Sequence, residues 1–492
     1  MPLHKALAHH AETRPDQLAV SLGARSLSFG ELHRRSQALD GFFSTLPRQH
    51  RDQAQEVPLV AVHMGNHTAL PELLAAALAG SCCIMLLDPL LPAARIQDIL
   101  DRLPPDALFT AADGDNFHIK APVYSVTSHE SLDPLIAASP AQATSPTPSD
   151  PFMVAFTSGT TSTPKAFARD RASWQRSLGR GRSHFGMHAG LSTLAPGPLV
   201  HGLSLYAFAE TLEAGASFHA MDKFTAEGAA DIIARQKVRR LVCVPTMLEA
   251  LSQTQPDLPD LAQITTAGAK LPPDLLAKTQ DFARNAKITE YYGASELGFV
   301  TTITHRAGGT VAQSVGTAFR EVTLDIRHPD AEGHGEIWVK SDLVIQDYLW
   351  RDDDSGFRRD GAWSSVGDIG RIEGGNLHLI SRAGGMVTSG GNNIYLDEVS
   401  THLRAHPMIK DAAVLGIEDR YLGTRLVAVV EPTDSGITQG ALVAHCQSGL
   451  QKYKIPRAFY RLAKWPMTTS GKIATGQLNN WILEEDDRLA PL

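Results

Sequence analysis

The 492-residue sequence is poor in cysteine and lacks a long hydrophobic or basic run. Its four cysteines show no metal-ligand spacing, so we expect buried thiols in a reducing cytoplasm. The longest apolar run, residues 73–87, is shorter than the roughly 20 residues of a membrane span and is interrupted by Gly80. No apolar signal segment stands near the amino terminus. We therefore expect a cytoplasmic protein without a membrane span.

Charge and composition argue against a nucleic-acid-binding protein and against a non-globular one. The net charge of −8, without a cluster of Lys and Arg, argues against nucleic acid as a partner. Hydrophobic residues make up 43% and charged residues 20%, the balance of an ordinary globular protein. A chain of this length predicts two or more domains.

Apolar patterning indicates parallel sheets covered by helices. Strand-like runs at residues 57–64, 239–245 and 262–268 alternate with helical patterns at 92–103 and 227–236. Short strands with frequent turns follow from residue 311 to about 380, and helices mixed with strands come after Arg382. These changes of pattern predict a β-rich unit and then a small carboxyl-terminal domain.

The stretch FTSGTTSTPKAF, residues 156–167, surrounds one lysine with small hydroxyl side chains. After an apolar strand, Gly159 lets the backbone approach a ligand, and Lys165 adds a positive charge. Such a loop fits phosphate, although a polar surface turn would have a similar composition. The glycine and lysine spacing is not that of a Walker A loop. The candidate phosphate-binding residues are Thr157, Ser158, Gly159, Thr160, Thr161 and Lys165.

Three further stretches follow in a fixed order: YYGASELG at 291–298, SSVGDIGRI at 364–372 and PMTTSGKI at 466–473. With the phosphate loop, they make the sequence resemble the adenylate-forming enzymes, which include acyl-CoA synthetases, peptide-synthetase adenylation domains and beetle luciferases. The resemblance covers nearly the whole chain. It implies an α/β multidomain protein, in which residues 1–381 combine two parallel-type sheets with a small β-barrel from about residue 311. Residues 382–492 would form a small mobile α+β cap, with the active site between the two parts.

The resemblance also implies a nucleotide site. Residues 157–165 would grip the β- and γ-phosphates of ATP, and Glu296 would hold Mg²⁺ through oxygen, as that cation prefers. A solvated surface carboxylate is the alternative for Glu296. Asp368 and Arg382 would contact the ribose. Gly268, Ala269 and Tyr292 would lie at the adenine, and Gly293 and Ser295 are further candidate cofactor-binding residues.

Lys472, in SGKI, is the candidate catalytic residue. Attack of a carboxylate on the α-phosphate builds negative charge, which a lysine on a glycine-flanked loop can stabilise. An exposed basic turn is the alternative. By resemblance, His201 would border the carboxylate and thiol tunnel, although a lone histidine is more often structural. Ser389, Gly390 and Gly391 would border the pantetheine of coenzyme A.

Four positions depart from the family pattern. Ser162 replaces a glycine of the phosphate loop, and Val366 replaces the common threonine before Gly367 and Asp368. Ser381 and Gly384 are unusual at the hinge. None of these substitutions removes a group that the chemistry needs.

The sequence therefore predicts an ATP-dependent ligase that forms an acyl-AMP and transfers the acyl group to coenzyme A. A ligase that loads a separate acyl carrier protein is the main alternative, and a luciferase-like oxygenase or a non-catalytic acyl-nucleotide sensor are further ones. Residues 198–208 contain no acidic side chain to pair with an ammonium group. Beside Leu203, Leu205, Tyr206 and Phe208, an unpaired ammonium would cost several kcal/mol. We therefore expect an apolar aliphatic or aryl acid, with fatty acids slightly favoured.

Overall fold

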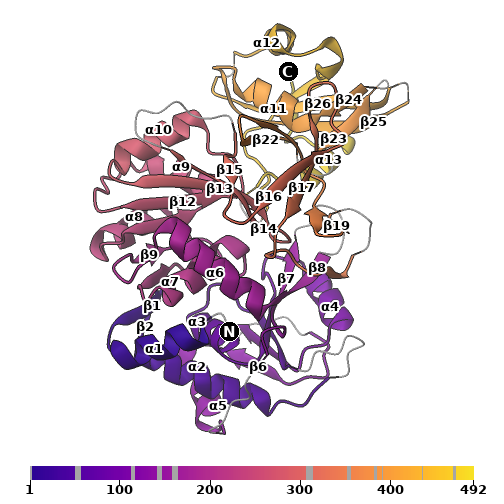
Figure 1. Ribbon diagram of the computed structural model, residues 1–492. Helices are drawn as coiled ribbons and strands as arrows, with labels where there is room; N and C mark the ends of the chain where they lie inside the picture. Colours follow the sequence, from indigo (N-terminus) through magenta and orange to yellow (C-terminus); the bar gives the residue numbers. More distant parts are fainter. Residues whose placement is uncertain are drawn as a thin grey trace. The chain divides into compact units, whose positions relative to one another are not determined.

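A computed structural model gives the fold of the chain (Figure 1). Twelve stretches of the chain are described, and all structural statements below refer to them. They are residues 3–49, 57–111, 117–140, 147–157, 165–305, 314–351, 356–381, 385–389, 392–420, 422–434, 436–468 and 472–492.

The chain divides into two compact units. Unit 1 contains the described residues of Met1–Gly159, Thr163–Ala312 and Ser341–Asp352. Unit 2 contains those of Gln313–Lys340 and Asp353–Leu492. The predicted domain boundary at residue 381 rests on the resemblance and stays a prediction.

The first sheet of unit 1 has seven strands in the order β18-β8-β7-β4-β3-β5-β6. The strands from β7 to β6 run parallel, and β8 and β18 add an antiparallel edge. The inner strand β3 is buried along its whole length, which explains its apolar run from Leu59 to Val62. The strand bounds are β3 Leu59–His63, β4 Cys83–Leu86, β5 Ala107–Ala111, β6 Val123–Val126, β7 Pro151–Thr157, β8 Lys165–Asp170 and β18 Tyr348–Trp350.

The second sheet of unit 1 contains the strand order β14-β13-β12-β11-β9-β10-β1-β2. Its inner strands are parallel, whereas β14 and β2 pair antiparallel with their neighbours. Two parallel-type sheets were predicted from the sequence, and this is confirmed. The bounds are β1 Leu18–Leu22, β2 Arg25–Ser28, β9 Thr193–Leu194, β10 Phe218–Ala220, β11 Arg240–Cys243, β12 Gln263–Ala267, β13 Lys287–Ala294 and β14 Gly298–His305.

Helices connect the parallel strands and cover the sheets (Figure 1). The predicted helix that ends at Gly80 is α3, and the strand after it is β4. Helix α6 begins after Asp170, whose carboxylate accepts from the backbone N–H of Ser173, and ends at Gly186 with φ of +64°. The bounds are α1 His4–Thr13, α2 Phe29–Ser44, α3 Leu70–Ala79, α4 Ala93–Arg102, α5 Asp133–Ala137, α6 Arg171–Phe185, α7 Gly202–Glu213, α8 Ala226–Arg235, α9 Pro245–Gln253 and α10 Pro273–Phe282.

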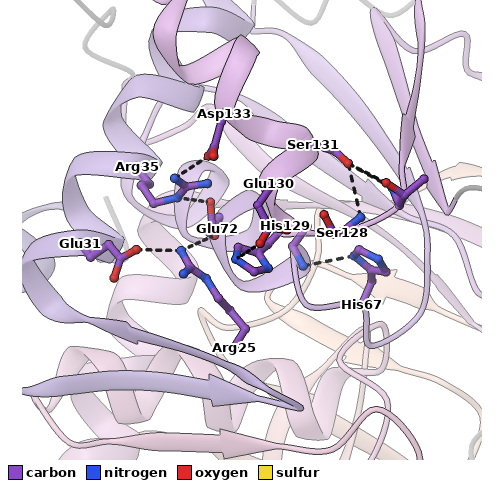
Figure 2. A network of polar contacts seen from close by, with 12 residues as sticks. Arg25, Glu31, Arg35, His67, Glu72, Ser128, His129, Glu130, Ser131 and Asp133 are labelled. Atoms are coloured by element: carbon purple, nitrogen blue, oxygen red, sulfur yellow. Dashed lines mark hydrogen bonds and ion pairs between the residues drawn. The ribbon is translucent and has the colours of Figure 1, made fainter.

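A buried carboxylate joins the amino-terminal elements. Figure 2 shows Glu72 of α3 between Arg25 of β2 and Arg35 of α2. The Glu72 side chain is fully buried, and its Oε2 lies 2.6 Å from Nε of Arg35. Burial raises the pKa of Glu72, although the two arginines oppose this shift. Arg35 also reaches Asp133 of α5 at 2.8 Å, so the network ties these elements together.

Unit 2 begins with a six-stranded antiparallel sheet, which confirms the predicted β-rich unit. Strand β17 lies inside it, with β16 on one edge and β20 and β21 on the other. The bounds are β16 Thr323–Arg327, β17 Gly335–Lys340, β19 Arg358–Asp360, β20 Trp363–Ser365, β21 Ile369–Glu373 and β22 Asn376–Ser381. The short strand β15, Thr317–Ala318, is not one of these six strands.

The rest of unit 2 is an α+β arrangement, as predicted. Residues alternate across β25 and β26, so that Val414 packs in one core and Leu415 in another. Residues of α11 and α12 share the first core, and residues of α13 share the second. The bounds are β23 Met386–Ser389, β24 Asn392–Tyr395, α11 Leu396–Arg404, β25 Ile409–Asp419, β26 Gly423–Pro432, α12 Gln439–Gly449, β27 Ala458–Arg461, α13 Thr475–Leu483 and β28 Ala490–Pro491.

Two further expectations concern cysteines and membranes. All four cysteines are free thiols and buried, as predicted. Among the described residues, no helix combines the length and the apolar character that crossing a membrane requires.

Candidate functional site

The predicted phosphate loop joins β7 to β8. Thr157 is the last residue of β7 and pairs in register with Lys165, the first residue of β8. The Lys165 side chain is buried, with 7% of its surface exposed. Ser158, Gly159, Thr160 and Thr161 lie outside the described residues, as does Ser162. Their phosphate role therefore stays a prediction.

The β13–β14 hairpin carries four predicted residues. Tyr292 and Gly293 belong to β13, and Ser295 and Glu296 form the turn that leads into β14. A Cβ at Gly293 would lie 2.2 Å from the carbonyl oxygen of Gly298. Only glycine fits this close approach between the two backbones. The turn therefore has a fixed shape, which places Glu296.

Glu296 is buried and held by hydrogen bonds. Its side chain is 7% exposed, and Oε1 accepts a hydrogen bond of 2.7 Å from the hydroxyl of Tyr348. Its backbone carbonyl accepts from the N–H of Ile345 at 2.8 Å. Among the described residues, no group of three or more His, Cys, Asp or Glu could hold a metal. A single carboxylate still suits Mg²⁺ at a nucleotide, because that ion takes its other ligands from phosphate and water.

Arg169, on β8, is buried and contacts the backbone of the same turn. Its guanidinium donates to the carbonyl oxygens of Ser295 and Leu343. Burial lowers the pKa of Arg169 to about 10, with Glu296 and Asp170 opposing the shift. The side chain is therefore still cationic at neutral pH. It brings a positive charge and one donor to the turn that carries Glu296, and its second donor holds the carbonyl of Leu343.

Gly268 and Ala269 follow the carboxyl end of β12. Strands β12 and β13 are parallel, with Ala267 opposite Tyr291, so this loop leaves the sheet at the same edge as Tyr292. Gly268 has φ of +92°, a conformation that side chains rarely adopt. Both residues are exposed.

Glu290 fixes the loop after β12, a role that the sequence motifs did not suggest. Its Oε2 accepts from the N–H of Leu271 at 3.0 Å, and its Oε1 lies 3.1 Å from Nζ of Lys270. The Glu290 side chain is buried, with 3% exposed. This carboxylate, next to the YYGASE motif, thus positions the candidate adenine loop.

His201 is the residue immediately before helix α7. Its Nε2 lies 3.6 Å from Oδ2 of Asp88, which follows β4. Asn66 orders the preceding loop: its amide donates to the carbonyls of Gly197 and Met221, at 3.2 and 2.7 Å, and accepts from Leu199. Neither Asp88 nor Asn66 was a candidate from the sequence.

Three predicted residues are described within unit 2. Asp368 is buried, with 3% exposed, after Gly367 at φ of +81°. Ser389 ends β23 and is 6% exposed. Lys472 is exposed, and its backbone bonds to Thr468 in both directions. Arg382, Gly390 and Gly391, together with Gly384, lie outside the described residues.

The structure brings Lys165 and Glu296 together through a third residue. Nζ of Lys165 lies over the ring of Tyr348, 5.8 Å from its centroid, and the hydroxyl of the same tyrosine bonds to Glu296. No motif in the sequence marked Tyr348, because its partners stand far away in the chain. His201 makes its described contact with a different residue, Asp88.

Comparisons with known proteins identify the family. The model of the AMP-binding enzymes matches residues 7–349, and that of the AMP-binding enzyme C-terminal domain matches residues 398–472. An uncharacterised acyl-CoA ligase of Bacillus subtilis, YhfT, is 31% identical over 486 residues, which cover 96% of this chain and 97% of the relative. The putative long chain fatty acid-CoA ligase VraA of Staphylococcus haemolyticus is 30% identical over 67% of this chain and 70% of its own length.

Solved structures share the fold. The o-succinylbenzoate coenzyme A synthetase MenE of Bacillus subtilis, in complex with AMP, matches with a TM-score of 0.83 at 22% identity over 99% of both chains. ATP-bound MatB of Rhodopseudomonas palustris gives 0.85 at 22% identity, over 96% of this chain and 98% of its own. MenE has also been solved with ATP and a magnesium ion. This chain therefore belongs to the AMP-binding enzyme family and is an enzyme of its AMP-forming acid-CoA ligase group.

Proposed function

We propose that the protein activates an apolar carboxylic acid with ATP and transfers the acyl group to coenzyme A. The carboxylate would attack the α-phosphate, form the acyl-AMP and release pyrophosphate. The thiol would then attack the acyl carbon and release AMP. The observation that carries this proposal is the gathering of Lys165 and Glu296 around Tyr348 in a chain of this family.

The nucleotide would be held by the residues that match the family motifs. We assign the β- and γ-phosphates to the loop from Thr157 to Lys165, the adenine to the Gly268 loop and Tyr292, and the ribose to Asp368 and Arg382. Bound Mg²⁺ would neutralise phosphate charge and align the reacting groups. Glu296 has the chemistry to hold this ion, since it is a buried carboxylate that is oriented by a hydrogen bond.

Lys472 would stabilise charge on the phosphoryl oxygens during adenylation. Its exposed position on a short turn leaves the ammonium group accessible to a ligand. His201 would border the carboxylate, and Ser389, Gly390 and Gly391 would border the thiol arm of coenzyme A. These roles rest on the resemblance of their motifs.

The chemistry of helix α7 supports an apolar acid. Of its two acidic residues, Glu210 is fully buried and lies 2.7 Å from Arg240, and Glu213 lies 3.3 Å from Arg182, so both carboxylates are paired with arginines. Leu205 and Phe208 lie in the core, whereas the partly buried hydrophobic residues of the predicted pocket segment are Val200, Leu203 and Tyr206. An α-amino group would find no carboxylate in residues 198–208. Aliphatic acids, as the name of VraA indicates for that relative, are favoured over aryl acids such as the o-succinylbenzoate of MenE.

ATP–pyrophosphate exchange across aliphatic, aryl and amino acids tests the proposal. We expect exchange with an apolar acid and none above background with amino acids. Faster turnover of an amino acid than of every simple acid would overturn the acid class, and no exchange with any acid would overturn adenylation.

The acceptor is tested separately, with purified acyl-AMP and either coenzyme A or a phosphopantetheinylated acyl carrier protein. We expect thioester formation with coenzyme A. Transfer to the carrier protein alone would replace our proposal with the carrier-loading alternative.

A further inference from the structure

Residues 341–352 form a segment that belongs to unit 1, although β17 before it and β19 after it belong to the six-stranded sheet of unit 2. Its first part is bound to helix α6. The guanidinium of Arg180 lies on both carboxylate oxygens of Asp342, at 2.6 and 3.1 Å, and Nε of Arg176 lies 2.9 Å from Oδ2. The bidentate contact of Arg180 and the additional contact of Arg176 fix both the position and the orientation of the Asp342 carboxylate.

The middle and end of the segment are fixed to the strands that carry the site. Arg169 of β8 donates to the carbonyl of Leu343, and the N–H of Ile345 donates to the carbonyl of Glu296. Strand β18 then pairs with β8, with Tyr348 opposite Phe167. The backbone of Tyr348 is thus anchored to α6, to β8 and to the β13–β14 turn.

From this anchored position, Tyr348 touches two groups of opposite charge. Its hydroxyl donates to Oε1 of Glu296 at 2.7 Å, and its ring lies under Nζ of Lys165 at 5.8 Å. A phenol that donates to a carboxylate fixes the rotation of that carboxylate, and an aromatic face attracts an ammonium group. Lys165 and Glu296 are each 7% exposed, so both contacts are shielded from competing water.

We infer that Tyr348 is a positioning residue of the nucleotide site: its hydroxyl holds Oε1 of Glu296 so that the other oxygen faces Mg²⁺, and its ring supports Lys165 at the phosphates. This inference rests on the proposed function, because Mg²⁺ and ATP are its ligands. It adds a residue that none of the sequence stretches quoted above contains, from a segment bound within unit 1 to α6, to β8 and to the β13–β14 turn.

The test measures metal binding directly. Mn²⁺ replaces Mg²⁺ and is titrated by electron paramagnetic resonance into protein saturated with a β,γ-methylene analogue of ATP. Tyr348→Phe keeps the ring and removes the hydroxyl. We expect it to weaken Mn²⁺ binding about 10-fold and to leave analogue binding without metal unchanged. Tyr348→Leu should weaken analogue binding without metal as well, because the ring under Lys165 is lost.

Two controls separate positioning from a general structural effect. Tyr124→Phe removes a hydroxyl from a ring that stacks on Phe109 at 4.9 Å and should change neither affinity. In a Glu296→Gln background, Tyr348→Phe should cause no further loss of Mn²⁺ binding, since the hydroxyl acts through that carboxylate. Thermal unfolding checks that each variant is folded.

The outcomes are distinguishable. Unchanged Mn²⁺ binding in Tyr348→Phe, or an equal loss in the Glu296→Gln background, overturns the inference and leaves the proposed function in place. A wild-type protein that binds neither the analogue nor Mn²⁺ overturns both. A 10-fold loss that disappears in the Glu296→Gln background supports the inference.

Discussion

The β13–β14 turn leaves no room for a side chain at Gly293, and Gly293→Ala tests how strictly the turn must be held. The new methyl carbon would lie 2.2 Å from the carbonyl oxygen of Gly298 and 3.2 Å from its carbon, both backbone atoms. Even close carbon–oxygen contacts have a separation of about 3.3 Å, so the two strands must move apart by roughly 1 Å. This movement occurs three residues before Glu296.

The expected loss follows from that displacement. Glu296 is fixed by a 2.7 Å bond to Tyr348, and a shift of about 1 Å is enough to break it. Misplacement of catalytic groups by about 1 Å can reduce rates on the order of 10²-fold. We therefore expect Gly293→Ala to lower ATP–pyrophosphate exchange by about 10²-fold. Overpacking should also cost roughly 1–3 kcal/mol of stability.

Gly179→Ala is the matched control for this substitution. Gly179 lies in helix α6, is exposed, and has no atom within 4 Å of an added Cβ. Alanine there should leave exchange unchanged and raise stability by up to about 1 kcal/mol. Exchange by Gly293→Ala within twofold of wild type, in a protein that is folded, would refute the argument that the turn geometry positions Glu296.

Three other predictions concern Lys472, His219 and the Glu210–Arg240 pair. Lys472 is exposed, so Lys472→Ala should change stability by less than about 0.5 kcal/mol while lowering adenylation on the order of 10²–10³-fold. Thioester formation from supplied acyl-AMP should largely survive; equal loss in both half-reactions would contradict the assigned role. His219 is 2% exposed, and burial lowers its pKa to about 4, below the 6.5 of an unfolded chain. Its contribution to stability is therefore complete above pH 6.5 and is lost as the pH falls toward 4, by about 2 kcal/mol between pH 7 and pH 5 in urea unfolding. His219→Asn should remove this part of the pH dependence, and an unchanged pH dependence would show that the histidine does not cause it. Arg240→Met should cost about 3–5 kcal/mol, because it leaves the buried carboxylate of Glu210 unpaired, whereas the double change to Glu210→Leu and Arg240→Met should recover most of this loss. Additive losses in the double variant would count against this explanation.

The fold class could be predicted from the sequence because the hydrophobic pattern of each element agrees with its burial in the structure. The strand β3 and the helix α3 are buried throughout, and they are apolar except for His63 in β3 and Glu72 in α3. Gly80 ends the helix where expected. The apolar strand predicted before the phosphate loop is β7, which ends at Thr157. Elements whose burial follows their own pattern can be recognised without knowing their partners.

The supporting residues of the site could not be found in this way. Tyr348 and Arg169 act across 52 and 126 residues of sequence, on Glu296 and on the carbonyl of Ser295. A tyrosine on a short strand and an arginine inside a β-strand have no local signature of these contacts. The assignment of Leu205 and Phe208 to a substrate pocket stays a prediction for a related reason. Both residues belong to a buried core, and apolar side chains on a helix look alike in the sequence whether they face a ligand or the core.

The return of residues 341–352 to unit 1 has a consequence for synthesis on the ribosome. The first 305 residues contain both β8 and the β13–β14 turn, but not the strand β18 or the carbonyl of Leu343. While only those residues have emerged, Arg169 lacks one of its acceptors and the edge of β8 is open. Unit 1 therefore completes its first sheet only after the strands of unit 2 that precede residue 341 have been made. A fragment that ends before residue 341 should expose this edge, and unpaired edges favour association between chains.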